Sequence, residues 1–161
     1  MKHLILATLC ATLTAGQASA LSCLPSDVAR AFEQASSAEE RYVVLLGSFN
    51  FDMPPQTSTD INRPDIRRTE AQFTGEYLGA DGFTSAPALT VDLEFDCLAA
   101  WCGALPETGD QTLAFVEMVG DDYSLSVGPC FEKTFVRPSP EDVARVEACM
   151  RGDTCEEMPL R

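Results

Sequence analysis

Three carboxylates, at Asp92, Glu94 and Asp96, are the clearest candidates for chemistry in this sequence. They occupy every second position of an alternating stretch, so in a strand they share one face, about 6 to 7 Å apart. Such carboxylates suit the acid and base of a hydrolase, or calcium ligands. A solvated strand face is the simpler interpretation, because calcium sites need about six or more oxygens converging from a curved loop.

Other reactive side chains are scarce. The single histidine, His3, lies within the first 20 residues, and Lys133 is the only lysine after them. A Ser-His-Asp triad and a histidine metal site are therefore excluded from residues 21–161. No glycine-rich phosphate-binding motif occurs. We expect no catalytic residue, no metal and no cofactor, with a carboxylate-dependent hydrolase as the alternative.

Residues 1–20 have the pattern of a secretory signal peptide, with a basic start, a short apolar run and the exit Ala18-Ser19-Ala20. We expect cleavage after Ala20 and a mature chain in the periplasm or outside the cell. Residues 21–161 then form one domain of ordinary size. No segment approaches the roughly 20 apolar residues of a membrane span, so we expect no stable membrane insertion.

Cysteines dominate the rest of the chain. An even count in an exported protein predicts up to three disulfides, and the absence of a Cys-x-x-Cys pair makes a zinc site a weak alternative. Two of them flank the predicted end of the C-terminal helix, where they would join the tail to the helix. The six cysteines beyond the signal peptide are Cys23, Cys97, Cys102, Cys130, Cys149 and Cys155.

The charge is strongly negative. The full chain carries a formal charge of −14, and loss of Lys2 with the signal peptide leaves −15. An acidic surface repels phosphate backbones and anionic lipids, so nucleic acid is not an expected partner. We expect an exported protein of unknown identity as the partner.

Hydrophobic patterning predicts five strands flanked by two helices. The first strand is expected to bend or bulge at Gly47, and the N-terminal helix is expected to cover one opening of a barrel. An exposed loop is predicted over 53–68, with Arg63, Arg67 and Arg68 pairing locally with Asp60, Asp65 and Glu70. The strands are predicted at 42–52, 69–78, 88–97, 112–118 and 123–128, and the helices at 27–36 and from Pro140 to a stop at Gly152.

The only tryptophan, Trp101, lies between two cysteines and near Leu98 and Leu105. One interpretation makes it an exposed anchor for a partner, because tryptophan is enriched in binding hot spots. The other makes it a lid that packs over a disulfide and closes the barrel.

Trp101-Cys102-Gly103, LAFVE at 113–117 and YSLSVGPC at 123–130 resemble the netrin-like domain, a family that includes the N-terminal domain of tissue inhibitors of metalloproteinases. The resemblance covers these pieces closely and most of the mature chain loosely. It implies a mainly β fold: a five-stranded OB-type Greek-key barrel, flanked by N-terminal and C-terminal helices and stabilised by disulfides.

The same resemblance implies disulfide partners. It pairs Cys23 with Cys130 and leaves Cys102 to pair with Cys97. The alternative, Cys23 with Cys102 and Cys97 with Cys130, stays open.

The resemblance also implies a non-enzymatic, exported protein-binding module, related to protease inhibitors. Those inhibitors begin with Cys-x-Cys, whereas Leu21-Ser22-Cys23 keeps only the second cysteine. A calcium-stabilised structural protein is a further alternative. The candidate binding edge consists of Leu21, Ser22, Leu98, Trp101 and Leu105.

Overall fold

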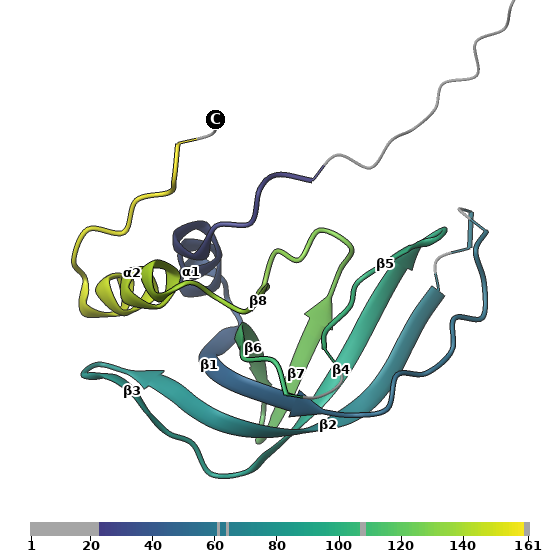
Figure 1. Cartoon of the computed structure of the whole chain (residues 1–161), viewed down its shortest axis with the longest axis horizontal. Helices are drawn as coiled ribbons and strands as arrows, with labels where there is room; N and C mark the ends of the chain where they lie inside the picture. The colour runs from purple at the N-terminus through teal and green to yellow at the C-terminus, as the bar shows by residue number, and fades with distance from the viewer. Residues whose placement is uncertain (1–22, 61, 64, 107–108, 160–161) are drawn as a thin grey trace, which may run out of the picture.

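The computed structural model describes residues 23–60, 62–63, 65–106 and 109–159, and within them five strands close a barrel (Figure 1). All neighbours in the barrel are antiparallel except β4 and β7, which are parallel. The circuit runs β1–β2–β4–β7–β6 and returns to β1. This is the expected OB-type Greek-key barrel. Its strands are β1 (Arg41–Asn50), β2 (Asp65–Gly79), β4 (Leu89–Leu98), β6 (Thr112–Val119) and β7 (Asp122–Val127).

Three short strands extend this barrel and were not expected from the sequence. They are β3 (Gly82–Ser85), which continues a hairpin with β2, β5 (Trp101–Cys102), which pairs with the end of β4, and β8 (Thr134–Val136), which pairs with β6. Each is too short to show a period of two in the sequence. Their pairing depends on the longer strand beside them.

The strand β2 begins at Asp65, so the exposed loop predicted over 53–68 is shorter than expected. Residues 65–68 pair with β4, from Asp65 opposite Cys97 to Arg68 opposite Glu94. Arg68 consequently forms its ion pair with Glu94, at 2.7 Å, and not with Glu70. The two adjacent arginines conceal the alternation that would have marked this part of the strand.

The expected bulge at Gly47 is also absent: β1 pairs with β2 in unbroken register from Leu45 to Asn50. Gly47 lies opposite Gly75, and a Cβ atom on Gly47 would come within 2.8 Å of the Gly75 Cα atom. The two glycines therefore permit a close approach of the two strands, which a side chain at either position would prevent.

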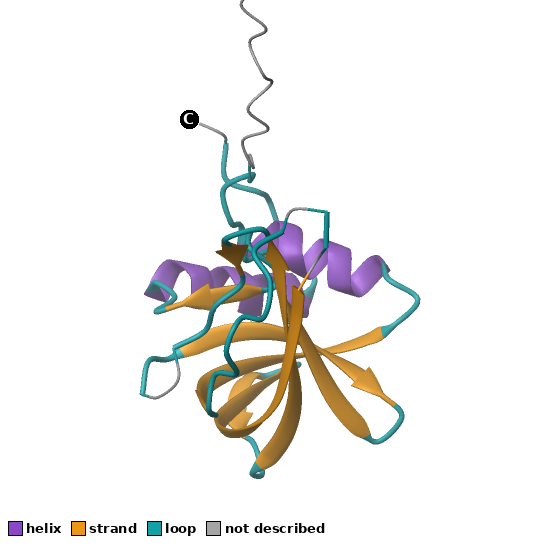
Figure 2. Cartoon of the chain, turned by 90° about the vertical axis from the view of Figure 1, so that its right-hand side faces the viewer, coloured by secondary structure: helices purple, strands orange, loops and turns teal. Residues whose placement is uncertain are grey.

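The described residues form two apolar cores, one inside the barrel and one outside it. Continuous apolar runs in β1 and β6 are buried on both faces, because Leu45 and Ala114 point into the barrel while Val44, Leu46 and Phe115 point outward. The outward side chains pack under α1 (Val28–Ser37) and α2 (Pro140–Arg151). Figure 2 shows both helices against one side of the barrel. The N-terminal helix thus covers the barrel wall and not an opening.

Three disulfides join the described cysteines. Cys23 bonds Cys130, Cys97 bonds Cys102, and Cys149 bonds Cys155. The first ties the N-terminal segment to the chain after β7, across 107 residues. The first two bonds are the ones that the resemblance implies, and the alternative pairing does not occur. The third joins the tail to the end of α2, as expected from the positions of its two cysteines.

Candidate protein-binding surface

The hairpin formed by β4 and β5 presents the tryptophan. Cys97 pairs with Cys102 and Leu98 pairs with Trp101, so only Ala99 and Ala100 remain in the turn. Ala99 adopts a left-handed backbone with φ of 55°, which suits a two-residue hairpin turn but is unfavourable for a residue with a Cβ atom. The Cys97–Cys102 disulfide crosses the hairpin next to this turn and holds the two strands together.

Trp101 lies on the outer face of this hairpin. Cys97 is buried, and side chains alternate along a strand, so Leu98 and its partner Trp101 point away from the barrel interior. Trp101 is 64% exposed and Leu98 is 37% exposed. The interpretation of Trp101 as a lid that closes the barrel is therefore wrong. The Trp101 side chain is exposed, as the other interpretation requires.

Ile66 extends this apolar surface onto the neighbouring strand. It lies opposite Asp96 on the outer face of β2 and is 42% exposed. Ile66, Leu98 and Trp101 together form what we call the Trp101 patch. Large apolar side chains grouped on one surface are typical of interaction sites.

The other residues of the expected binding edge do not join this patch. Leu105 is 5% exposed and packs in the barrel core. The prediction that it belongs to the binding edge is therefore wrong. The sequence did not distinguish a buried from an exposed leucine in this segment, because it has no regular alternation. Leu21 and Ser22 lie outside the described residues, as do the predicted signal peptide and its cleavage site.

The segment between β1 and β2 supports the turn of the hairpin. The Gln56 side-chain amide donates hydrogen bonds to the carbonyl oxygens of Ser58 and Ala99, both at 2.7 Å. The segment is in turn held by Asp65, whose carboxylate accepts from the Thr57 hydroxyl at 2.6 Å and the Thr57 backbone N–H at 2.7 Å. These two hydrogen bonds lower the pKa of Asp65 below its usual value, despite partial desolvation. The turn is thus braced from outside the hairpin.

Gly103 fixes the other end of the hairpin against the barrel. Its backbone N–H donates to the carbonyl of Asp96 at 2.9 Å. A Cβ atom at this position would collide with the carbonyl oxygen of Val127. The absence of a side chain at Gly103 therefore allows the chain to pass directly against the end of β7.

The three carboxylates singled out in the sequence do lie on the outer face of β4, but each faces a different group. Glu94 pairs with Arg68, Asp96 accepts a hydrogen bond from the Ser126 hydroxyl at 3.0 Å, and Asp92 lies opposite Glu70. Among the described residues no group of three or more acidic, cysteine or histidine side chains is placed to hold a metal ion. The carboxylates form a row along the strand and do not converge on one point.

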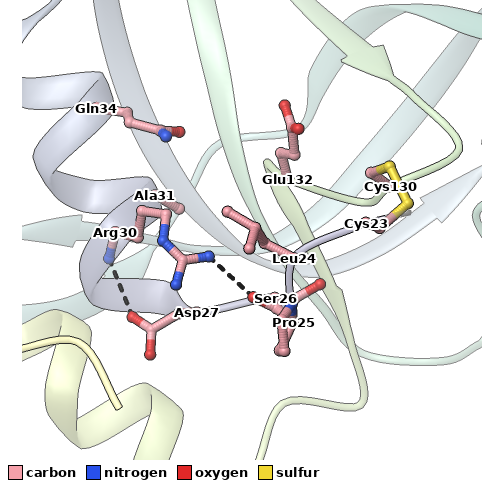
Figure 3. Close-up of a pocket in the computed structure, with 10 residues that line it drawn as sticks. All are labelled: Cys23, Leu24, Pro25, Ser26, Asp27, Arg30, Ala31, Gln34, Cys130 and Glu132. Atoms are coloured by element: carbon pink, nitrogen blue, oxygen red, sulfur yellow. Dashed lines mark hydrogen bonds between the residues drawn. A yellow bond between two sulfur atoms is a disulfide. The ribbon is translucent and has the colours of Figure 1, made fainter. Parts of the chain in front are cut away.

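A second feature, which sequence reasoning missed, lies at the N-terminal segment. A pocket of about 280 Å³ lies between this segment, α1 and the Cys23–Cys130 disulfide, and Figure 3 shows the residues that line it. Beside it Asp27 is 5% exposed and caps α1 by accepting from the backbone N–H groups of Ala29 and Arg30. The Asp27 carboxylate also lies 3.8 Å from the Arg145 guanidinium. An acid at the start of the predicted helix is a signal for a cap, but nothing in the sequence linked Asp27 to Arg145.

Comparison with protein-family models, with curated proteins and with solved structures gave no match. Within the described residues, none of the helices combines the length and the apolar character of a membrane span. The three disulfides are consistent with a location in the periplasm or outside the cell, where such bonds form and persist.

Proposed function

We propose that this chain is an exported, non-enzymatic protein-binding module of the netrin-like type, and that the Trp101 patch is its binding edge. Export requires the signal peptide at residues 1–20, with cleavage after Ala20 and release into the periplasm or the medium. The single observation that carries the proposal is the 64% exposure of the only tryptophan, on a hairpin closed by a disulfide.

The hairpin that carries Trp101 is already ordered in the free protein, which favours binding. A partner that binds a flexible loop must first order it, and this ordering opposes association. Here the Cys97–Cys102 bond and the Gln56 contact to Ala99 already hold the hairpin before a partner arrives. An exposed tryptophan on an ordered support is typical of a binding hot spot.

The same features favour a binding edge that differs from that of the resembling protease inhibitors. Their wedge needs a cysteine two positions before Cys23, where this chain has Leu21. Hydrolysis by Asp92, Glu94 and Asp96 has less support, since two of these carboxylates already contact Arg68 and Ser126. A structural calcium ion would have to be bound by the same three carboxylates, which do not converge on one point.

The test is affinity capture of exported proteins of the source organism on the purified, disulfide-bonded protein. Trp101→Ala is compared with Val119→Ala, a matched control, because Val119 is 52% exposed at the end of β6 in the turn to β7. We expect a partner that is retained by Val119→Ala and reduced at least about tenfold by Trp101→Ala. Since Trp101 is the only tryptophan, binding should also shield its fluorescence from acrylamide. Equal recovery on both variants would rule out this edge.

A further inference from the structure

Beyond the Trp101 patch, Glu70 and Asp92 lie directly opposite each other on the outer faces of β2 and β4. Side chains of a directly opposed pair are about 5 Å apart at their Cβ atoms, and like charges in such a pair destabilise a sheet. No ion pair to either carboxylate occurs among the described residues. The surface therefore carries two carboxylates, Glu70 and Asp92, that repel each other. A positively charged group of a binding partner would reduce this repulsion.

This pair is the far end of an acidic row that begins at the Trp101 patch. We call the outward side chains of Arg68, Glu70, Asp92, Glu94 and Asp96 the outer strip. The outer strip holds four carboxylates and one guanidinium, and that guanidinium is bound to Glu94 by contacts of 2.7 Å from Nε and Nη2. Its net charge is therefore negative and is not neutralised within the strip.

The shape of the outer strip suits an elongated ligand. An open depression of about 440 Å³ lies over its far part, lined by Arg68, Glu70, Asp92, Glu94 and Ser124 among others. Asp92 is six residues from Leu98, which corresponds to about 20 Å of strand. The carboxylates of β4 repeat every second residue, and basic side chains on one face of an extended peptide repeat at the same spacing.

We propose that the partner contributes an extended basic segment, with an apolar residue against the Trp101 patch and basic residues along the outer strip. This inference rests on the proposed function and gives the chemistry of the partner. Charge complementarity carries it: the opposed Glu70 and Asp92 carboxylates meet a cation, and the exposed Trp101 ring offers a face to an apolar or cationic side chain.

The test uses a short synthetic peptide of alternating arginine and threonine with a phenylalanine at one end. It is titrated into the purified, disulfide-bonded protein at about 0.15 M ionic strength, and Trp101 fluorescence and peptide anisotropy are read together. The same peptide with glutamate in place of arginine is the ligand control. The variant Glu70→Gln/Asp92→Asn is compared with Glu33→Gln/Glu156→Gln, which changes the net charge equally at exposed positions of α1 and the C-terminal tail.

We expect saturable binding of the basic peptide and none of the acidic one. Glu70→Gln/Asp92→Asn should weaken binding about three- to tenfold, and Glu33→Gln/Glu156→Gln should leave it unchanged. Equal weakening by both double variants would mean that overall charge attracts the peptide, and would overturn the inference. Absence of saturable binding would overturn it too.

The capture experiment separates this inference from the proposed function. A partner that is lost with Trp101→Ala but fully retained by Glu70→Gln/Asp92→Asn leaves the binding edge in place and refutes the basic segment. If no partner depends on Trp101, the proposed function itself fails.

Discussion

The carboxylate of Asp27 accepts a hydrogen bond from the backbone N–H of Met158 at 2.8 Å, although 131 positions separate the two residues. The same carboxylate caps α1 and faces Arg145 of α2. Glu157, next to Met158, pairs with Arg30 of α1 at 2.7 Å. One buried acid therefore joins the N-terminal segment, both helices and the C-terminal tail.

Replacement of Asp27 by asparagine should destabilise the protein by about 1 to 3 kcal/mol at neutral pH, because the partly buried Arg145 keeps only Glu141 as an acidic partner and the cap is weakened. The measurement is urea denaturation of both proteins. Glu33→Gln, an exposed acid on the same helix, is the control and should have little effect.

The destabilisation caused by Asp27→Asn should depend on pH. Burial alone would raise the pKa of Asp27, but hydrogen bonds from Met158, Arg30 and Ala29 and the charge of Arg145 together lower it below its usual value. A lowered folded-state pKa gives a stabilisation that is present above the unfolded pKa, near 4, and lost as the pH falls through the folded pKa. The gap in stability between wild type and Asp27→Asn should therefore narrow below about pH 4. A gap that widens in acid would contradict this account.

Gly103→Ala should destabilise the protein by about 1 to 3 kcal/mol, because the new Cβ atom would overlap the Val127 carbonyl and a strand backbone cannot readily move. Gly128→Ala is a close control, since nothing lies within 4 Å of a Cβ atom built there. Thermal unfolding of the two variants checks this. Similar melting temperatures would show that the hairpin adjusts without strain.

Removal of the Cys23–Cys130 bond should destabilise the protein more than removal of the Cys149–Cys155 bond. The first closes a span of 107 residues and the second a span of 6. Loop-closure entropy then predicts losses of about 5 and about 2 kcal/mol for the paired cysteine-to-alanine variants. Denaturation without reductant measures both. Equal losses would mean that chain entropy is not the main contribution.

Glu70→Gln should raise the stability by about 0.2 to 1 kcal/mol, because it removes one of two directly opposed carboxylates. Glu70→Arg should raise it further, through an ion pair with Asp92. Denaturation midpoints at low salt show the effect, which should decrease as salt screens the charges. A loss of stability in Glu70→Gln would mean that Glu70 and Asp92 do not repel each other. The basic segment inferred above would then have no repulsion to reduce.

Asp65→Ala should expose the segment 51–60 to proteolysis, because Asp65 accepts both hydrogen bonds from Thr57 that hold this segment. Limited digestion with a broad-specificity protease, followed by mass spectrometry, identifies the cut. Asp60→Ala is the control. Among the described residues, the Asp60 carboxylate accepts hydrogen bonds only from Asn62, two positions along the chain, so it does not tie the segment to the barrel. Unchanged digestion of Asp65→Ala would mean that other contacts hold the segment.

Hydrophobic patterning, as alternation or as a continuous apolar run, predicted the five barrel strands and both helices because each is long enough to show its own pattern. It failed at residues 65–68, where the pairing with β4 forms a strand from a sequence rich in polar residues and turn formers. It also failed for Leu105, whose burial depends on the closed barrel around it. The row of Asp92, Glu94 and Asp96 was predicted on one face, but the groups opposite them come from β2 and β7.

The amino-acid sequence by itself determined the class of fold, the number of cysteines available for disulfides and the strongly acidic charge, because these follow from local spacing and composition. Only the tertiary structure decided that Trp101 is exposed, that Glu70 faces Asp92 and that Asp27 reaches Met158. The reason is physical: exposure and pairing are set by strand register and by segments far apart in the chain, and local patterns carry little information about either.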